Sequence, residues 1–164
     1  MKLKKKLCDL FSKPQTSLLI KFLFSIPVLF SLGLASSCSN EPVDDPIPYQ
    51  PFPDIVINLS LPEFISLSLD GGHVNTSGGI RGIILYRENS NTYHAYERNC
   101  SYHPNDACAT IEVHLSGLYM EDPCCGSIFN FPDGFPTGGV AWRPLVQYET
   151  ILNGSTLTIT DRVL

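Results

Sequence analysis

Lysine and histidine are scarce in the part of the sequence that would fold. All six lysines precede residue 38, and no histidine follows His114. Residues 38–164 carry five arginines against fifteen aspartates and glutamates, a net charge of −10. Nucleic-acid-binding proteins present basic patches to the phosphates, so this composition excludes a nucleic-acid partner. It also excludes electrostatic attachment to an anionic membrane, so that any membrane attachment must come from lipid chains.

Familiar catalytic motifs are absent as well. The sequence contains no Gly-x-Ser-x-Gly nucleophile elbow, no His-Glu-x-x-His motif and no phosphate-binding loop. His94 and His114 alternate with apolar neighbours, which predicts solvent-facing strand positions, and His73 follows two glycines in a turn-like context. No nucleophile–base pair can be assigned. We therefore expect no enzyme activity and no catalytic residue.

The first 37 residues predict an export signal. Six lysines between positions 2 and 21 accompany an apolar run at 22–34, which has the length of a signal h-region and is short for a membrane span. The following Leu-Ala-Ser-Ser-Cys at 34–38 resembles a bacterial lipobox. That resemblance implies that Cys38 is the lipidated first residue of the mature protein. A transmembrane anchor and ordinary secretory cleavage are the alternatives.

A lipoprotein signal predicts a place in the bacterial cell envelope. We expect the chain to be anchored through the lipid on Cys38, and to the outer membrane rather than the inner membrane. Residues 38–53 contain five prolines, three acids and few apolar residues, which predicts an extended tether. Residues 54–164 suffice for one domain with one core. No specific protein partner is indicated.

Short runs of alternating apolar residues predict an all-β domain. No stretch after residue 53 combines sustained helical periodicity with a cap. Many short strands at close spacing favour an antiparallel β-sandwich or small barrel. The expected strands lie at 55–59, 64–69, 81–86, 92–96, 110–113, 118–120, 128–131, 146–148 and 156–160, the third and fourth forming a hairpin around residues 88–91.

Three motifs follow one another in this domain. The first is Tyr-x-Ala-Tyr-x-Arg-x-Cys at 93–100, the second is Asp-Pro-Cys-Cys-Gly-Ser-x-Phe at 122–129, and the third is Arg-Pro-Leu-x-x-Tyr at 143–148. In this order they resemble a Rieske iron–sulfur domain, and also degenerate Rieske-type lipoproteins of Bacteroidetes-like bacteria. The resemblance covers roughly residues 54–164. It implies a Rieske-like fold in which two loops approach each other.

The resemblance also implies where a two-iron cluster would bind. A Rieske cluster takes two thiolates on one iron and two imidazoles on the other. Cys100 occupies a ligand position of the first loop, but Tyr102 stands at the imidazole position and His103 comes one residue late. Asp122 and Cys125 replace the Cys and His of the second loop. We therefore expect no cofactor. The alternative is a 2Fe-2S cluster held atypically by Cys100, His103, Asp122 and Cys125.

The cysteines of the domain suggest disulfides, because exported proteins meet oxidising conditions. Many Rieske domains link their two loops by a disulfide, and the corresponding residues here are Cys108 and Cys124. Cys100 and Cys125 would then form a second bridge in place of the cluster. The swapped pairing, Cys100 with Cys124 and Cys108 with Cys125, stays open. Zinc held by four cysteines is a further alternative, strained because adjacent residues of an extended loop point to opposite sides.

Three functional hypotheses follow. The first is a cell-envelope lipoprotein whose degenerate Rieske-like domain has a structural or binding role, with disulfides where the cluster would be. The second is an electron-transfer protein with an atypically ligated cluster. The third is a thiol-redox or metal-binding protein that uses Cys100 with Cys124 and Cys125.

Overall fold

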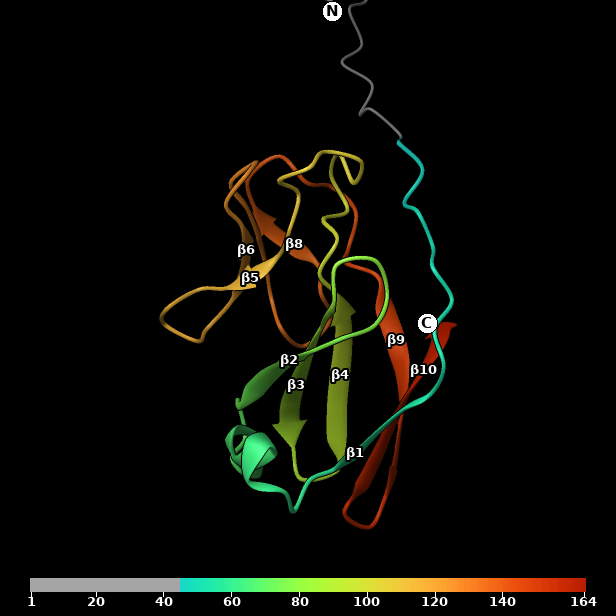
Figure 1. Ribbon diagram of the computed structural model, residues 1–164. Coiled ribbons are helices and arrows are strands. Elements are labelled where there is room, and N and C mark those ends of the chain that lie inside the picture. Colours follow the sequence, from blue (N-terminus) through green and yellow to red (C-terminus); the bar gives the residue numbers. More distant parts are fainter. Residues whose placement is uncertain (1–44) are drawn as a thin grey trace, which may run out of the picture. The chain divides into compact units, whose positions relative to one another are not determined.

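The computed structural model describes residues 45–164. The predicted export signal, its lipidation site Cys38 and the first part of the tether lie outside the described residues. All strand pairs are antiparallel, which confirms the predicted all-β class (Figure 1). Within 45–164, no helix is long and apolar enough to cross a membrane. The elements are β1 (Ile55–Asn58), the 3-10 helix η2 (Pro62–Ser68), β2 (His73–Thr76), β3 (Ile83–Asn89), β4 (Thr92–Glu97), β5 (Glu112–Val113), β6 (Met120–Asp122), β7 (Ser127–Phe129), β8 (Pro136–Gly138), β9 (Gln147–Asn153) and β10 (Thr156–Val163).

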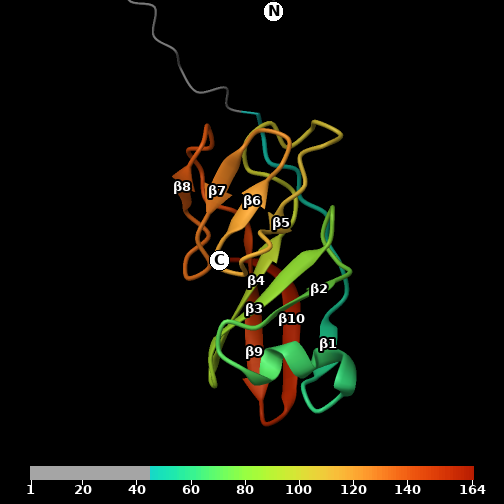
Figure 2. The ribbon, with the colours of Figure 1, turned by 90° about the vertical axis from the view of Figure 1, so that its left-hand side faces the viewer.

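The strands form two sheets. The larger sheet has the order β1-β10-β9-β4-β3-β2, and the smaller has the order β5-β6-β7-β8 (Figures 1 and 2). In the larger sheet, β3 and β4 form the predicted hairpin, with Asn89 opposite Thr92. β9 and β10 form a second hairpin, with Asn153 opposite Thr156. The smaller sheet is inserted in the sequence between β4 and β9, so its loops are held between two neighbouring central strands.

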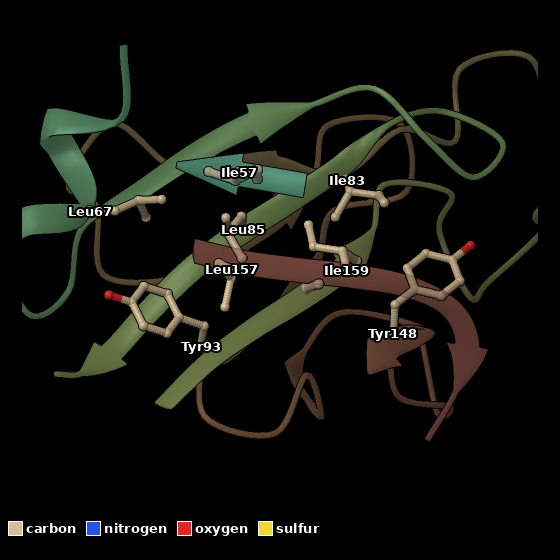
Figure 3. Close-up of a cluster of buried hydrophobic side chains, with 9 residues drawn as sticks. Ile57, Leu67, Ile83, Leu85, Tyr93, Tyr148, Leu157 and Ile159 are labelled. Carbon is tan, nitrogen blue, oxygen red and sulfur yellow. The ribbon is translucent and has the colours of Figure 1, made fainter. Parts of the chain in front are cut away.

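The first three residues of strand β3 are buried on both faces, and this explains how the two sheets share one domain. Ile83, Ile84 and Leu85 are all fully buried. Successive side chains of a strand point to opposite faces. Ile83 and Leu85 accordingly join one apolar cluster, while Ile84 joins another. The first cluster, on one face of the larger sheet, is drawn in Figure 3 and consists of Ile57, Leu67, Ile83, Leu85, Tyr93, Ala95, Tyr148, Leu157 and Ile159.

The second cluster joins the larger sheet to the smaller one. Tyr96 of β4 and Ile84 of β3 contribute from the larger sheet, and Met120 of β6 and Phe129 of β7 from the smaller. The Tyr96 hydroxyl donates a hydrogen bond to the carbonyl oxygen of Phe131. Burial of this apolar surface stabilises the smaller sheet, whose strands are only two or three residues long. The complete cluster is Ile84, Tyr96, Cys100, Ala109, Ile111, Met120, Phe129, Phe131 and Leu145.

One expected strand is wrong, and two observed strands were not expected. The expected strand at 64–69 is η2, which starts at Pro62, a residue suited to the first helical position, and buries only Leu67. Strands β2 and β8 were not expected, because the polar sequence His-Val-Asn-Thr and the sequence Pro-Thr-Gly lack alternating apolar residues. His73 therefore begins an edge strand instead of lying in a turn.

Part of the predicted tether contacts the domain. Residues 45–53 form no helix or strand. The Tyr49 hydroxyl donates to Asp161 Oδ2 at 2.8 Å, and the ring of Phe52 packs edge-on against Tyr148 with centroids 4.9 Å apart. The carbonyl oxygen of Asp45 accepts a hydrogen bond from Arg143. This segment thus lies along the domain, although its composition suggested too few apolar residues to pack.

A buried carboxylate fixes the end of β4. Glu97, which is 1% exposed, accepts hydrogen bonds from the backbone N–H groups of Ile80 at 2.9 Å and of Arg81 and Asn99 at 3.0 Å. It also accepts one from the Tyr148 hydroxyl at 2.8 Å. Burial raises the pKa of Tyr148, and the bond to Glu97 raises it further, so this hydroxyl remains a donor. Glu97 therefore joins the segment before β3 to β4 and β9.

We predict that Glu97→Gln lowers the free energy of unfolding by about 2–5 kcal/mol. The glutamine amide nitrogen is a donor, and in either orientation it faces at least one backbone N–H that Glu97 now satisfies. Urea unfolding measures the effect. Glu112→Gln, an exposed strand carboxylate, is the matched control and should change stability by less than about 0.5 kcal/mol. Equal stability of the two variants would contradict a structural role for the Glu97 network.

Candidate functional site

The first site loop runs from Cys100 to Thr110, between β4 and β5. It closes on itself, because the Cys100 N–H donates to the Ala109 carbonyl oxygen at 3.1 Å. Arg81 holds the loop from outside. Its guanidinium donates to Asn99 Oδ1 at 2.6 Å, to the Ala107 carbonyl oxygen at 2.8 Å and to Thr110 Oγ1 at 3.1 Å. The loop is thus positioned by an arginine that lies just before β3.

The second site loop is the turn between β6 and β7. Asp122 and Ser127 are paired across these two strands, and four residues connect them. The Gly126 N–H donates to the Asp122 carbonyl oxygen at 2.8 Å, and Gly126 has a φ of 73°, a conformation that favours glycine. Asp122 Oδ1 accepts from the Cys124 N–H at 2.7 Å. The Asp122 side chain therefore folds back over its own turn.

A third segment, residues 139–143, connects the two loops. Gly139 approaches the second loop so closely that a Cβ there would lie 2.4 Å from Ser127 Cα. The N–H groups of Val140 and Ala141 donate to Ser127 Oγ at 3.2 and 2.9 Å. On the other side, Arg143 donates to the Ser101 carbonyl oxygen at 2.7 Å. Both loops are therefore fixed to one segment.

A disulfide also links the loops. Cys108 and Cys124 are bonded, with Cα atoms 5.6 Å apart, so the pairing expected from the Rieske resemblance is present. Both residues are exposed. The bridge lies at the surface of the loop pair, and the swapped pairing does not occur.

The predicted second bridge is absent. Cys100 and Cys125 are free thiols, Cys100 buried and Cys125 half-buried. Each sulfur has other partners. Cys100 Sγ accepts from the Tyr102 N–H at 3.4 Å, and Cys125 Sγ donates to Asp122 Oδ2 at 3.2 Å. The carboxylate of Asp122 thus binds the Cys125 sulfur within its own turn.

The two thiols and this carboxylate form a compact cluster. Sγ of Cys100, a carboxylate oxygen of Asp122 and Sγ of Cys125 all lie within 4.8 Å of one another. Burial raises the pKa of Cys100 well above its ordinary value, and the hydrogen bond to Asp122 raises it further, against a smaller lowering by the Tyr102 N–H. Cys100 is therefore protonated at neutral pH, which argues against its use as a thiolate nucleophile.

Of the four alternative ligands predicted from the sequence, the structure brings three together. His103 is not part of the cluster, because its Nδ1 lies 3.2 Å from Asp45 Oδ2. Tyr102, for which the resemblance implied an imidazole position, packs against the second apolar cluster. His94, expected to face solvent, lies between Glu88 and Gln147, with hydrogen bonds of 2.8 and 3.0 Å.

A two-iron cluster of the Rieske type does not fit these residues. It requires two imidazoles on one iron, and none of the four histidines joins the cluster formed by Cys100, Asp122 and Cys125. The donors that converge are two thiols and one carboxylate, so the iron that needs two imidazoles would have no ligands of that kind.

Ser127 and the segment after Gly139 were not identified as site residues from the sequence. Ser127 was part of the Gly-Ser-x-Phe motif, but nothing in the motif indicated that its hydroxyl receives the Val140 and Ala141 N–H groups. Trp142 is 47% exposed, and the Arg143 guanidinium lies 5.0 Å from its ring centroid.

No family model matches the chain, and no curated protein is significantly similar to it. Among solved structures, it is similar to a chain of the complex of reduced oxygenase and oxidized ferredoxin in carbazole 1,9a-dioxygenase, with a TM-score of 0.44 and 20% identity over 58% of this chain and 85% of that one. It is also similar to the ferredoxin of carbazole 1,9a-dioxygenase from Nocardioides aromaticivorans IC177, with a TM-score of 0.40 and 16% identity over 57% of this chain and 88% of that one.

We predict that the double variant Cys108→Ser/Cys124→Ser loses about 2–4 kcal/mol of unfolding free energy. Because the bridge lies at the surface, its removal should speed amide hydrogen exchange in both loops before it affects β3 and β4. Urea unfolding and hydrogen exchange measure the two effects, with Ala107→Ser as the control for a serine in the same loop. Unchanged stability, or uniform loosening of the whole domain, would contradict this assignment.

Proposed function

We propose that this chain is a bacterial cell-envelope lipoprotein whose β domain is a degenerate Rieske-like domain with a non-catalytic binding or structural role. The observation that carries the proposal is the filling of the ligand positions. Tyr102 packs against the core where an imidazole would project, and His103 is paired with Asp45. The second loop offers Asp122 and Cys125 in place of Cys and His.

The loops also have enough protein contacts to keep their arrangement without a two-iron cluster. The Cys108–Cys124 bridge joins them covalently, and Arg81 anchors the first loop. Ser127 anchors the second loop to the segment after Gly139. A scaffold that retains its loops after losing metal ligands is suited to recognition of a partner.

Exposed side chains beside the second loop support a binding role. Val140 and Trp142 are 52% and 47% exposed. They belong to the segment in which the Val140 and Ala141 N–H groups donate to Ser127 Oγ, and these hydrogen bonds fix the backbone that carries both side chains. Trp and Arg are enriched among residues that dominate protein–protein binding, and Trp142 with Arg143 forms a cation–π pair. The binding role proposed here is directed to a protein partner.

Electron transfer through an atypically ligated cluster is the second candidate. The convergence of Cys100, Asp122 and Cys125 favours it, because these residues come from both loops. The lack of an imidazole in that group argues against electron transfer, since one of the two irons of a Rieske cluster is held by two histidines.

We predict no stoichiometric iron or acid-labile sulfide in full-length protein that is expressed and purified without oxygen. Elemental and sulfide analysis decide between the candidates. Two irons and two sulfides per chain, with a rhombic EPR signal on reduction that disappears in Cys100→Ser/Cys125→Ser, would establish the electron-transfer candidate instead.

We predict that Cys38→Ser releases the protein from the membrane fraction or leaves its signal uncleaved. Lipid attached to this residue would be the only strong anchor of a chain so acidic after residue 37. Cell fractionation and the mass of the mature chain provide the readout. Cys8→Ser, which changes a cysteine inside the signal, should leave both unchanged. Normal processing and membrane retention of Cys38→Ser would refute the lipoprotein assignment.

A further inference from the structure

The cluster of Cys100, Asp122 and Cys125 has the donor set of a mononuclear metal site. Two sulfurs and one carboxylate oxygen suit zinc, whereas hard ions such as calcium and magnesium prefer oxygen ligands throughout. In a tetrahedral site with Zn–S of about 2.3 Å and Zn–O of about 2.1 Å, the ligand atoms lie about 3.6–3.8 Å apart. The three donor atoms are within 4.8 Å of one another, and Cys125 Sγ and Asp122 Oδ2 are 3.2 Å apart, so binding would require shifts of only about 1 Å or less in these separations.

The burial of Asp122 gives the first reason to expect a cation. Asp122 is 1% exposed, and within residues 45–164 it forms no ion pair. Buried carboxylates are ordinarily paired with a cation or bound to a metal, because an isolated buried charge is costly. Its Oδ1 accepts the Cys124 N–H, so Oδ2, which accepts only the weak Cys125 S–H donor, is the oxygen that would bind a metal ion once that proton has left.

The hydrogen bonds around Ser127 give the second reason. Its Oγ lies 3.1 Å from Cys125 Sγ and already accepts two backbone N–H groups, from Val140 and Ala141. Cys125 Sγ is the donor toward Ser127 Oγ and also toward Asp122 Oδ2, but a thiol carries a single proton. Two oxygen acceptors therefore face one donor, an excess of acceptors that a cation at this place would offset.

The sulfur of Cys100 also has a hydrogen-bond partner outside the three donors. Cys100 Sγ accepts the Tyr102 N–H. Outer hydrogen bonds of this kind orient metal ligands and contribute to affinity. We propose that Cys100, Asp122 and Cys125 bind one zinc ion, with water as the fourth ligand on the side of the half-exposed Cys125. Both thiol protons would be released to solvent on binding.

Such a site goes beyond the proposed binding role and differs from a Rieske centre in its ligands, its stoichiometry and the absence of sulfide. The ion would join the two loops beneath the surface, on the inner side of the exposed Cys108–Cys124 bridge. His103 would have no part in it, which separates this site from the four-residue set suggested by the sequence.

The test is a titration of full-length, metal-free protein with Zn²⁺ and with Co²⁺ in the absence of oxygen. We expect one ion per chain and, with Co²⁺, a thiolate-to-metal charge-transfer band. Asp122→Asn and Cys125→Ser should each weaken binding by more than about 100-fold, beyond the 10–100-fold typical of outer partners. Asp106→Asn, which removes an exposed carboxylate from the first loop, and His103→Ala should leave affinity unchanged.

Alkylation of the wild-type protein provides a measurement that does not depend on variants folding. Zinc should protect Cys125, the half-buried thiol, from iodoacetamide, as read by peptide mass spectrometry. The proposal would be overturned if zinc did not bind stoichiometrically or if Cys125→Ser left the charge-transfer band unchanged. It would also be overturned if His103→Ala weakened binding as much as Cys125→Ser does, or if the native protein contained a Cys100–Cys125 disulfide. Iron with sulfide in this protein would instead overturn the proposed function, so the two failures are distinguishable.

Discussion

The covalent link between Cys108 and Cys124 is the constraint on which the site depends. It fixes the first loop, which follows β4, against the turn between β6 and β7. Because each loop then carries one further cysteine, Cys100 and Cys125 are brought to the same place, together with Asp122. Arg81 and the segment after Gly139 support the two loops from either side. The site therefore depends on how the loops are held, since the first loop contributes Cys100 and the second contributes both Asp122 and Cys125.

Two buried carboxylates in this domain have different roles. Glu97 receives four hydrogen bonds, from three backbone N–H groups and the Tyr148 hydroxyl, and its bonding capacity is used within the fold. Asp122 receives one backbone N–H, and its remaining oxygen faces a thiol. A saturated carboxylate stabilises a junction of strands, whereas one that faces thiols is available to a cation. This difference in partners assigns Glu97 to the architecture and Asp122 to the site.

The sequence predicts well where alternation and hairpin spacing are strong. β3 with β4 and the strand at 156–160 are confirmed because their apolar residues alternate and fill both clusters. The apolar residues of η2 alternate as those of a strand do, so its sequence does not distinguish the two structures. β2 is a polar edge strand, so its sequence carries no alternation to predict it. The Cys108–Cys124 pairing followed from the family resemblance. That Cys100 and Cys125 stay free thiols could not be predicted, because it depends on hydrogen bonds to Asp122 and Ser127. The contact of His103 with Asp45, 58 positions away, could not be predicted either.

The central claim is that the loop pair is held by one disulfide, with two free thiols beside a carboxylate and no two-iron cluster. Intact-mass spectrometry of the mature protein under native and then denaturing conditions tests it most directly. We predict a denatured mass lower than that of the fully reduced chain by two hydrogens, and a native mass without iron or sulfide. A denatured mass lower by four hydrogens, or a native mass that includes two irons and two sulfides, would contradict the account.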